Sequence, residues 1–173
     1  MKKFLMLLAL CAALLLTLTA CGGSEQPSSQ EETDIPVVEG DTLSADLANT
    51  FLPMAAAAEG AAAEALAQEF LAAAELPFEA MVMPVEPGLL MGFGDVEITG
   101  FSEGVLFGPA ISTIPFLGYV FQLEEGADGA AFCQTLQEYC DLRWNICTAA
   151  EEVVAVQGGD YVFFLMCPSS LEG

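Results

Sequence analysis

The alternation of apolar and polar stretches is clearest in the last third of the chain. Apolar runs predict three strands there, at Leu117–Leu123, Val153–Val156 and Tyr161–Cys167. Apolar side chains recur at helical spacing from Ala130 to about Trp144, so an amphipathic helix is expected between the first two strands. Asp128 stands where it can cap that helix, and the two glycines within residues 157–160 predict a hairpin-like turn. This order of elements is typical of an α+β domain with a small antiparallel sheet.

The middle of the chain is divided by prolines and glycines. Short strands are expected at Ala80–Met83, Val96–Phe101 and Val105–Phe107. No charge occurs from Val105 to Leu123, a length that invites comparison with a membrane span. Pro109 and the other prolines and glycines in that stretch argue against a continuous helix, so buried strands and turns are expected instead.

Alanine dominates residues 43–76 and predicts helices, because alanine has the highest helix propensity. Ser44 is the expected N-cap of the first helix, and Pro53 is expected to break or kink it. The fold class predicted from the whole pattern is α+β. Alanine-rich helices come first, followed by a small antiparallel sheet with one amphipathic helix packed on it, in a single domain over residues 43–173.

The first twenty residues have the composition of an export signal. Lys2 and Lys3 precede an uncharged run of about fifteen residues, shorter than the roughly 20 that a membrane-spanning helix needs. The run ends in Leu18-Thr19-Ala20-Cys21, which resembles the lipobox of bacterial lipoproteins. That resemblance implies removal of residues 1–20 and attachment of acyl chains, such as palmitate, to Cys21. The mature protein would then be anchored to the bilayer on the extracytoplasmic face of the cell membrane.

Residues 21–42 are expected to form a disordered acidic tether, since they combine glycine, serine and proline with six acidic residues and offer little to bury. The whole chain has 25 acidic residues, three basic residues and no histidine. Loss of residues 1–20 would remove both lysines and leave Arg143 as the only cation, for a formal charge of −24. This charge argues against a nucleic-acid partner. The absence of histidine excludes catalytic arrangements and metal sites that depend on imidazole.

Three features carry a second resemblance. The strand that ends in Gly118-Tyr119-Val120-Phe121, the helix after it and the closing run Gly159–Phe164 are similar to small uncharacterised lipoproteins of Gram-positive type. Members of that group carry an α+β domain of unknown function after a lipobox and an acidic tether. Their helix usually bears lysines, whereas this helix keeps only Arg143. The resemblance therefore implies a fold and an anchor, but no activity and no catalytic residues.

Four cysteines follow Cys21. Cys133, Cys140 and Cys147 are spaced by seven residues, which would place neighbours about 10 Å apart on one straight helix. That separation is too long for a disulfide, so these three cannot pair with one another while a single helix holds them. Buried free thiols are the expected state. One disulfide from Cys167 to Cys133, Cys140 or Cys147 is the alternative.

Few polar residues are candidates for a binding site. Glu124, Glu125 and Asp128 lie in a glycine-containing turn that could hold calcium, but they do not match the alternating ligands of an EF-hand, and a solvated turn is expected. Arg143 is a candidate contact for an anionic ligand or a partner, although pairing with a nearby acid such as Asp141 is the more ordinary role. No cofactor or metal is expected.

The leading hypothesis is therefore a non-enzymatic, membrane-anchored extracytoplasmic lipoprotein that acts as an interaction or accessory module of the cell envelope. Its expected partners are the bilayer, through acylated Cys21, and another envelope protein. The alternative is an extracytoplasmic protein that binds a solute or a cation such as calcium. A hydrolase that uses paired carboxylates ranks lowest, because 25 acidic residues supply such pairs by chance.

Overall fold

The computed structural model describes residues 35–111 and 113–171, which belong to one compact unit. The predicted signal peptide, Cys21 and most of the predicted tether lie outside the described residues. The elements follow in the order α2 (Leu43–Ala57), α3 (Ala63–Ala73), β1 (Ala80–Val85), β2 (Gly88–Leu89), β3 (Glu97–Ile98), β4 (Phe101–Pro109), β5 (Leu117–Leu123), α4 (Gly129–Tyr139), β6 (Glu152–Gly158) and β7 (Tyr161–Cys167). No helix within the described ranges is both long enough and apolar enough to span a bilayer.

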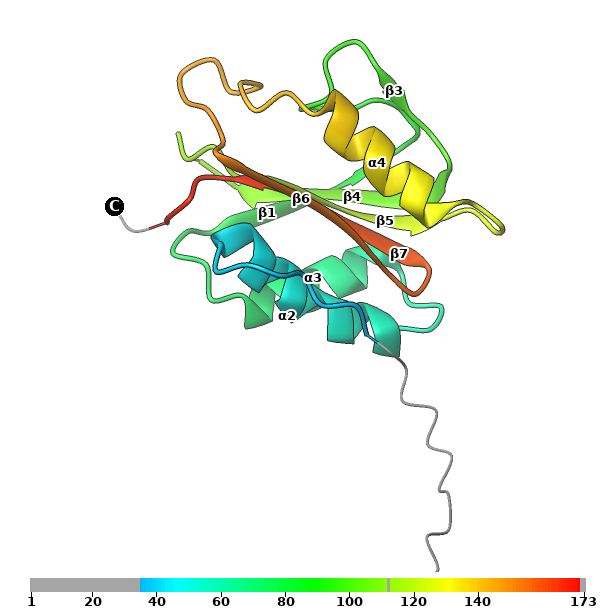
Figure 1. Ribbon diagram of the computed structural model, residues 1–173. Helices are drawn as coiled ribbons and strands as arrows, with labels where there is room; N and C mark the ends of the chain where they lie inside the picture. The colour runs from blue at the N-terminus through cyan, green and yellow to red at the C-terminus, as the bar shows by residue number, and fades with distance from the viewer. Residues whose placement is uncertain (1–34, 112, 172–173) are drawn as a thin grey trace, which may run out of the picture. The chain divides into compact units, whose positions relative to one another are not determined.

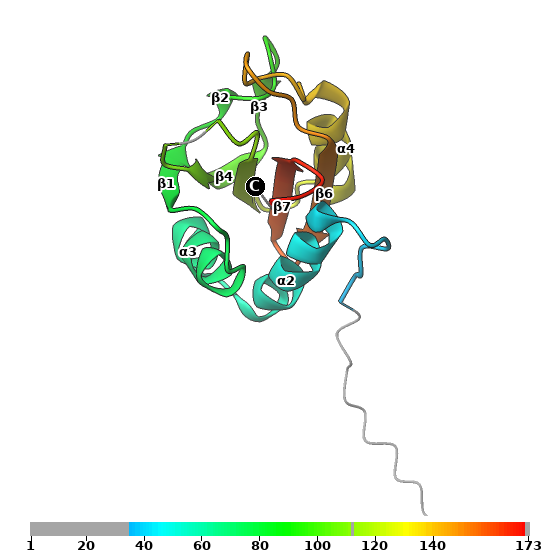
Figure 2. The same cartoon turned by 90° about the vertical axis from the view of Figure 1, so that its left-hand side faces the viewer.

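A five-stranded antiparallel sheet forms the centre of the fold, in the order β1-β4-β5-β7-β6. Helices α2 and α3 cover one face, and α4 covers the β6–β7 half of the other (Figure 1). The short ladder of β2 with β3 lies above β1 and β4, on the same side as α4 (Figure 2). The predicted α+β class, with an antiparallel sheet and one amphipathic helix packed on it, is confirmed.

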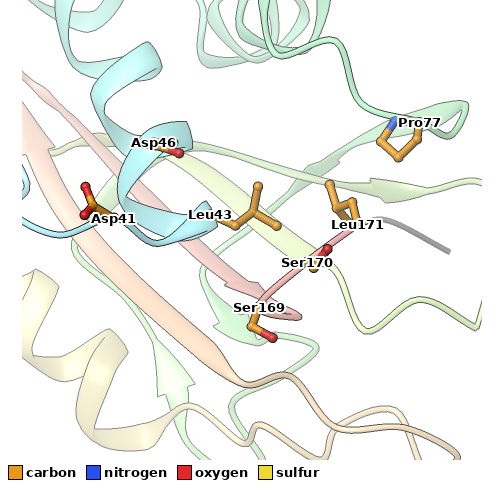
Figure 3. Close-up of a pocket in the computed structure, with 7 residues that line it drawn as sticks. All are labelled: Asp41, Leu43, Asp46, Pro77, Ser169, Ser170 and Leu171. Carbon is orange, nitrogen blue, oxygen red and sulfur yellow. The ribbon is translucent and has the colours of Figure 1, made fainter.

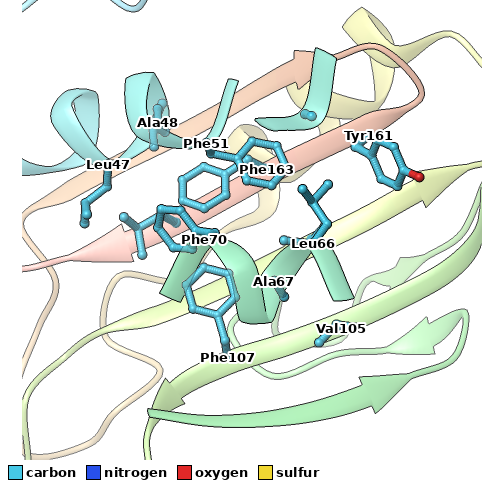
Figure 4. Packing of buried hydrophobic residues seen from close by; sticks show 14 of the residues in the cluster. Leu47, Ala48, Phe51, Leu66, Ala67, Phe70, Val105, Phe107, Tyr161 and Phe163 are labelled. Atoms are coloured by element: carbon cyan, nitrogen blue, oxygen red, sulfur yellow. The ribbon is translucent and has the colours of Figure 1, made fainter. Parts of the chain in front are cut away.

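Strand β7 is buried on both of its faces, which explains its unbroken apolar sequence. Tyr161, Phe163 and Leu165 belong to the core beneath α2 and α3, in which Figure 4 labels Tyr161 and Phe163. Phe164 and Met166 belong to the core beneath α4. Each core is rich in aromatic pairs; Phe163, for example, stacks on Phe51 with ring centroids 4.8 Å apart. The sheet is therefore held by two separate hydrophobic layers.

The N-cap of the N-terminal helix lies two residues earlier than predicted. Thr42 is the N-cap, with its hydroxyl accepting a hydrogen bond from Ala45 N at 3.2 Å, and the predicted cap Ser44 lies inside the helix. Pro53 does not break α2, which continues to Ala57. Proline has no N–H to donate to the carbonyl one turn earlier in the helix. Because Pro53 is exposed, water can donate a hydrogen bond to that carbonyl instead.

The folded region also begins before the predicted boundary at residue 43. Val38 packs against the core, and the Asn49 side chain of α2 bonds both its backbone N–H, at 2.8 Å, and its carbonyl, at 2.9 Å. Residues 35–42 thus run back along α2, with the earliest of them toward its Ala57 end (Figure 1). The last part of the predicted disordered tether, residues 35–42, is ordered because Asn49 supplies the hydrogen bonds that the segment cannot make itself.

Helix α4 ends at Tyr139 rather than near Trp144, and Cys140 is its extended C-cap. The chain beyond it makes loop contacts in place of helical hydrogen bonds. Asp141 N donates to Gly92 O at 2.7 Å, and Ala150 N donates to Leu142 O at 2.8 Å. Asp128 is the N-cap, as predicted, with Oδ1 accepting from Ala131 N at 3.0 Å.

Candidate functional site

Three loops converge at the end of the sheet where β4 ends and β5 begins. Residues 140–150 are joined to the turn at Gly92 by the Asp141 bond, and to residues 110–116 by Thr148 Oγ1, which donates to Thr113 O at 2.9 Å. The turn is also bonded to the sheet, because the hydroxyl of Tyr119 in β5 donates a hydrogen bond to Met91 O at 2.8 Å. Backbone and side-chain hydrogen bonds therefore hold all three loops in one arrangement.

Beneath these loops lies an apolar hollow of about 320 Å³, which we call the loop-end pocket. It lies on the α4 side of the sheet, over the strands that α4 does not cover. Its lining is mostly apolar and comprises Met81, Met91, Leu106, Gly108, Pro109, Ile114, Phe116, Leu117, Trp144 and Asn145. Pockets of this size and composition are typical sites for an apolar side chain or a small apolar ligand.

Trp144 is the only tryptophan in the chain, and it forms one wall of the pocket. Its indole Nε1 is buried without a hydrogen-bond partner, which is true of no other buried side-chain nitrogen or oxygen in the described part of the chain. A buried indole N–H normally finds an acceptor, so this donor is costly to leave unsatisfied.

Large apolar side chains are exposed on the loops around the pocket. Ile111 is 99% exposed, Ile146 is 92% exposed and Met91 is 54% exposed. Leu89 of β2, two residues before Met91, is 64% exposed. Single exposed apolar residues are ordinary, but a concentration of them on interconnected loops beside an apolar pocket is a feature of interaction sites.

A wider hollow lies elsewhere, at the start of α2. It has a volume of about 900 Å³ and lies between the helix and the C-terminal segment, with Leu43 and Leu171 on opposite sides (Figure 3). Asp41 and Asp46 lie at its helix side. The hollow is shallow and open to solvent.

The described cysteines are all free thiols. The alternative, a bridge from Cys167 to Cys133, Cys140 or Cys147, is not formed, and the sheet explains why. Cys167 lies in the core under α2 and α3, whereas Cys133 lies in the core under α4 and Cys140 packs against that same core. Cys147 is exposed on the loop. The expectation of buried thiols thus holds for Cys133 and Cys167 alone.

Burial suppresses the reactivity of three of these thiols, Cys133, Cys140 and Cys167. Desolvation raises the pKa of Cys133 to about 11. Desolvation, assisted by the nearby Glu152 carboxylate, raises the pKa of Cys167 to about 12. Burial is also the main cause of the raised pKa of Cys140. All three therefore remain protonated at neutral pH, where a nucleophile or a metal ligand would have to be a thiolate.

The acidic turn does not assemble a cation site. Asp128 uses Oδ1 to cap α4, and Glu124 and Glu125 are exposed in the turn before it. Over the described ranges, no group of three or more carboxylate or cysteine side chains is arranged to hold a metal ion. Arg143 is exposed on the loop next to Trp144, and its backbone N–H donates to Asp141 Oδ1 at 2.8 Å. It therefore remains available as a contact beside the loop-end pocket.

Two other carboxylates have structural roles that the sequence did not indicate. Glu152 of β6 accepts a hydrogen bond from Ser44 N at 2.8 Å, and Glu103 of β4 accepts one from Ala63 N at 3.1 Å. Each carboxylate therefore satisfies a free N–H at the N-terminus of a helix and interacts favourably with its dipole.

Scans against protein-family models, curated proteins and solved structures found no match to this chain. The site therefore rests on geometry alone. Sequence reasoning missed the residues of the loop-end pocket, because Met81, Met91 and Trp144 are distant in the chain and each has an ordinary apolar neighbourhood. The one available signal was the isolated isoleucines, Ile111 and Ile146, in otherwise polar or proline-containing segments.

Proposed function

We propose that this protein is a membrane-anchored extracytoplasmic lipoprotein, and that its folded domain is a non-enzymatic interaction module of the cell envelope. The anchor part of the proposal rests on Leu18-Thr19-Ala20-Cys21, which resembles a lipobox. The interaction part rests on one observation, the loop-end pocket surrounded by exposed apolar side chains. Ile111 and Ile146 are nearly fully exposed there, and exposed apolar side chains gathered beside an apolar pocket are typical of an interaction site.

The path of the chain is compatible with both parts. Residues 35–42 enter the domain toward the Ala57 end of α2, which adjoins the β6–β7 turn through the bond from Tyr161 OH to Ala58 O, 3.0 Å long. The loop-end pocket is lined by Pro109, at the end of β4, and Leu117, at the beginning of β5, so it lies at the other end of the strands. An anchor at Cys21 would therefore join the domain at the end remote from the proposed interaction surface.

The test is crosslinking of the lipidated protein in its native membrane, followed by mass spectrometry. The double variant Ile111→Ser/Ile146→Ser should lose the crosslinked partner while it retains the native stability, since neither side chain is buried. Val37→Ser is the matched control, because Val37 is a 74% exposed apolar residue outside the three loops. Retention of the same partner by the double variant would refute the interaction surface.

The anchor is tested separately. Cys21→Ser should leave the chain unacylated and uncut by the lipoprotein signal peptidase. Acyl chains found on that variant by mass spectrometry would refute the assignment of Cys21.

A further inference from the structure

The edge strand β1 is unprotected over its first half, before Pro84. Its sequence, from Ala80 to Val85, contains no charged residue, and no strand pairs with its outer side in the described part of the chain. Figure 2 shows β1 at one side of the sheet with α3 beneath it. Natural proteins usually protect such an edge with charges, proline or a covering element, because an open edge accepts further strands.

The register shows which backbone groups are available. Ala110 N donates to Glu79 O at 2.9 Å, so residues 79, 81, 83 and 85 turn their N–H and C=O groups toward β4. Ala80, Val82 and Pro84 consequently turn theirs outward. Pro84 has no N–H, but its position faces outward, so the sheet loses no hydrogen bond. The missing donor restricts full pairing with an added strand to the first half of the edge. Ala80 and Val82 can each donate a backbone N–H and offer a backbone C=O to an added strand.

A hollow lies on each side of this accepting segment. On the α4 side, Met81 belongs to the lining of the loop-end pocket. On the α3 side, Ala80 and Val82 line a second hollow of about 480 Å³, whose other walls include Leu71, Leu76 and Phe78. Side chains of a strand alternate between faces, so an added strand would send successive side chains into one hollow and then the other. This arrangement matches the way in which sheet edges recognise extended peptides.

Charge favours one class of partner. Glu79 and Glu86 lie immediately before and after β1, about 23 Å apart along an extended chain at about 3.3 Å per residue. Arg143 is the only cation that follows Lys3, against 25 acidic residues in the chain, so a second copy of this chain would be repelled. A segment with lysine or arginine at each end would instead be attracted to both flanking carboxylates.

We propose that β1 accepts an extended, apolar segment of a partner protein that carries basic residues at its ends, and that this segment inserts an apolar side chain beside Met81 into the loop-end pocket. This inference rests on the proposed function, because it names the partner of the same surface. It adds a defined binding mode, in which backbone hydrogen bonds to Ala80 and Val82 supply affinity and the two hollows supply specificity.

The probe is a synthetic peptide of about nine residues, sufficient to reach from Glu79 to Glu86, with alternating valine and threonine and a lysine at each end. It is added to the full mature chain, and hydrogen exchange is followed by NMR. The amides of Ala80 and Val82 should become protected, and Trp144 fluorescence should shift. The same peptide with glutamate ends, and one with a central proline, are the matched controls and should bind at least about tenfold more weakly.

Two variants test the edge without disturbing the inward ladder. Ala80→Pro removes one outward donor at the first residue of the strand, a position where proline is tolerated, and should weaken peptide binding about tenfold. Pro84→Ala restores an outward donor and should strengthen binding several-fold. Unchanged affinity in both variants would overturn the proposal.

Four other outcomes would also overturn it. Protection of Ala80 and Val82 before peptide is added would mean that another part of the chain covers the edge, and a dimer seen by sedimentation would mean that a second copy does. A peptide response that is confined to Trp144 and does not change in Ala80→Pro would refute pairing at the β1 edge. It would not contradict the proposal that the loop-end pocket binds a partner. Loss of the crosslinked partner in Ile111→Ser/Ile146→Ser, with no peptide effect at β1, would likewise separate the two proposals.

Discussion

The ring of Phe107 lies over Gly118, its direct neighbour across the β4–β5 register. A Cβ atom built on Gly118 would lie 2.0 Å from Phe107 Cζ, so the ring occupies the space that any other residue would need. Phe107 also stacks on Phe163 with ring centroids 5.8 Å apart and belongs to the core under α2 and α3. The glycine therefore allows an aromatic side chain to lie flat against the centre of the sheet.

Gly118→Ala is expected to destabilise the domain by about 1–3 kcal/mol, because Phe107 must leave its position in a densely packed core. The measurement is the urea midpoint, followed by the change in the free energy of unfolding. Phe107→Leu removes the clashing ring atoms, so Gly118→Ala should cost clearly less in that background. Additive costs in the double-mutant cycle would contradict the close contact.

Glu152→Ala is expected to destabilise the domain by about 0.5–2 kcal/mol, since it leaves Ser44 N at the start of α2 without its acceptor. Glu152→Gln keeps an acceptor oxygen and should lose only the charge interaction with the helix dipole, about 0.3–1 kcal/mol. The free energies of unfolding from urea titrations give the comparison. Glu97→Ala, at an exposed position on β3, is the control and should change stability by no more than about 0.5 kcal/mol.

The sequence predicted those elements whose pattern is local. Tyr161–Cys167 was predicted over its full length, because a strand buried on both faces is apolar at every position. Asp128 was recognised as a cap because capping depends on neighbours in the chain. The fold class followed from the order of these elements.

The end of α4 and the loop-end pocket could not be predicted in this way. Apolar spacing continues to Trp144, but Leu142 and Trp144 are apolar because they fold back over the second core, and the hydrogen bond from Asp141 N to Gly92 O competes with the helix. Such contacts join residues far apart in the chain. The same is true of Asn49, which orders Val38 and so shortens the predicted tether.

Thiol labelling distinguishes the structure from the disulfide alternative. In the folded mature domain, a small alkylating reagent should modify Cys147 first, because it is exposed, and Cys140 more slowly. Cys133 and Cys167 should react only after unfolding, since both are buried and their pKa values are raised. Peptide mapping by mass spectrometry gives the order. Recovery of Cys167 in a disulfide under native, non-reducing conditions would contradict the separation of the two cores.

The same two thiols predict a loss of stability in alkaline solution. A raised pKa in the folded state means that Cys133 and Cys167 contribute fully to stability below the thiol pKa of the unfolded chain, about 8.5. The contribution is lost as the pH rises toward about 11 for Cys133 and about 12 for Cys167. The free energy of unfolding should therefore decline above about pH 8.5. Cys167→Ala should show a shallower decline, whereas Cys147→Ala should follow the parent protein.

The C-terminal segment predicts a change on the acid side. Glu151 accepts hydrogen bonds from the hydroxyl and the backbone N–H of Ser169, and these lower the pKa of its carboxyl. A lowered pKa stabilises the fold above the unfolded value, about 4.3, and the contribution disappears as the pH falls through the folded value. Ser169→Ala removes the hydroxyl donor, so its deficit in thermal stability should be present at pH 7 and should shrink below about pH 4. Ser102→Ala, which removes another exposed hydroxyl that bonds a backbone carbonyl, is the control and should show no such pH dependence. A Ser169→Ala deficit that stays constant from pH 7 to about pH 3 would show that the serine acts by packing and not through the Glu151 carboxylate.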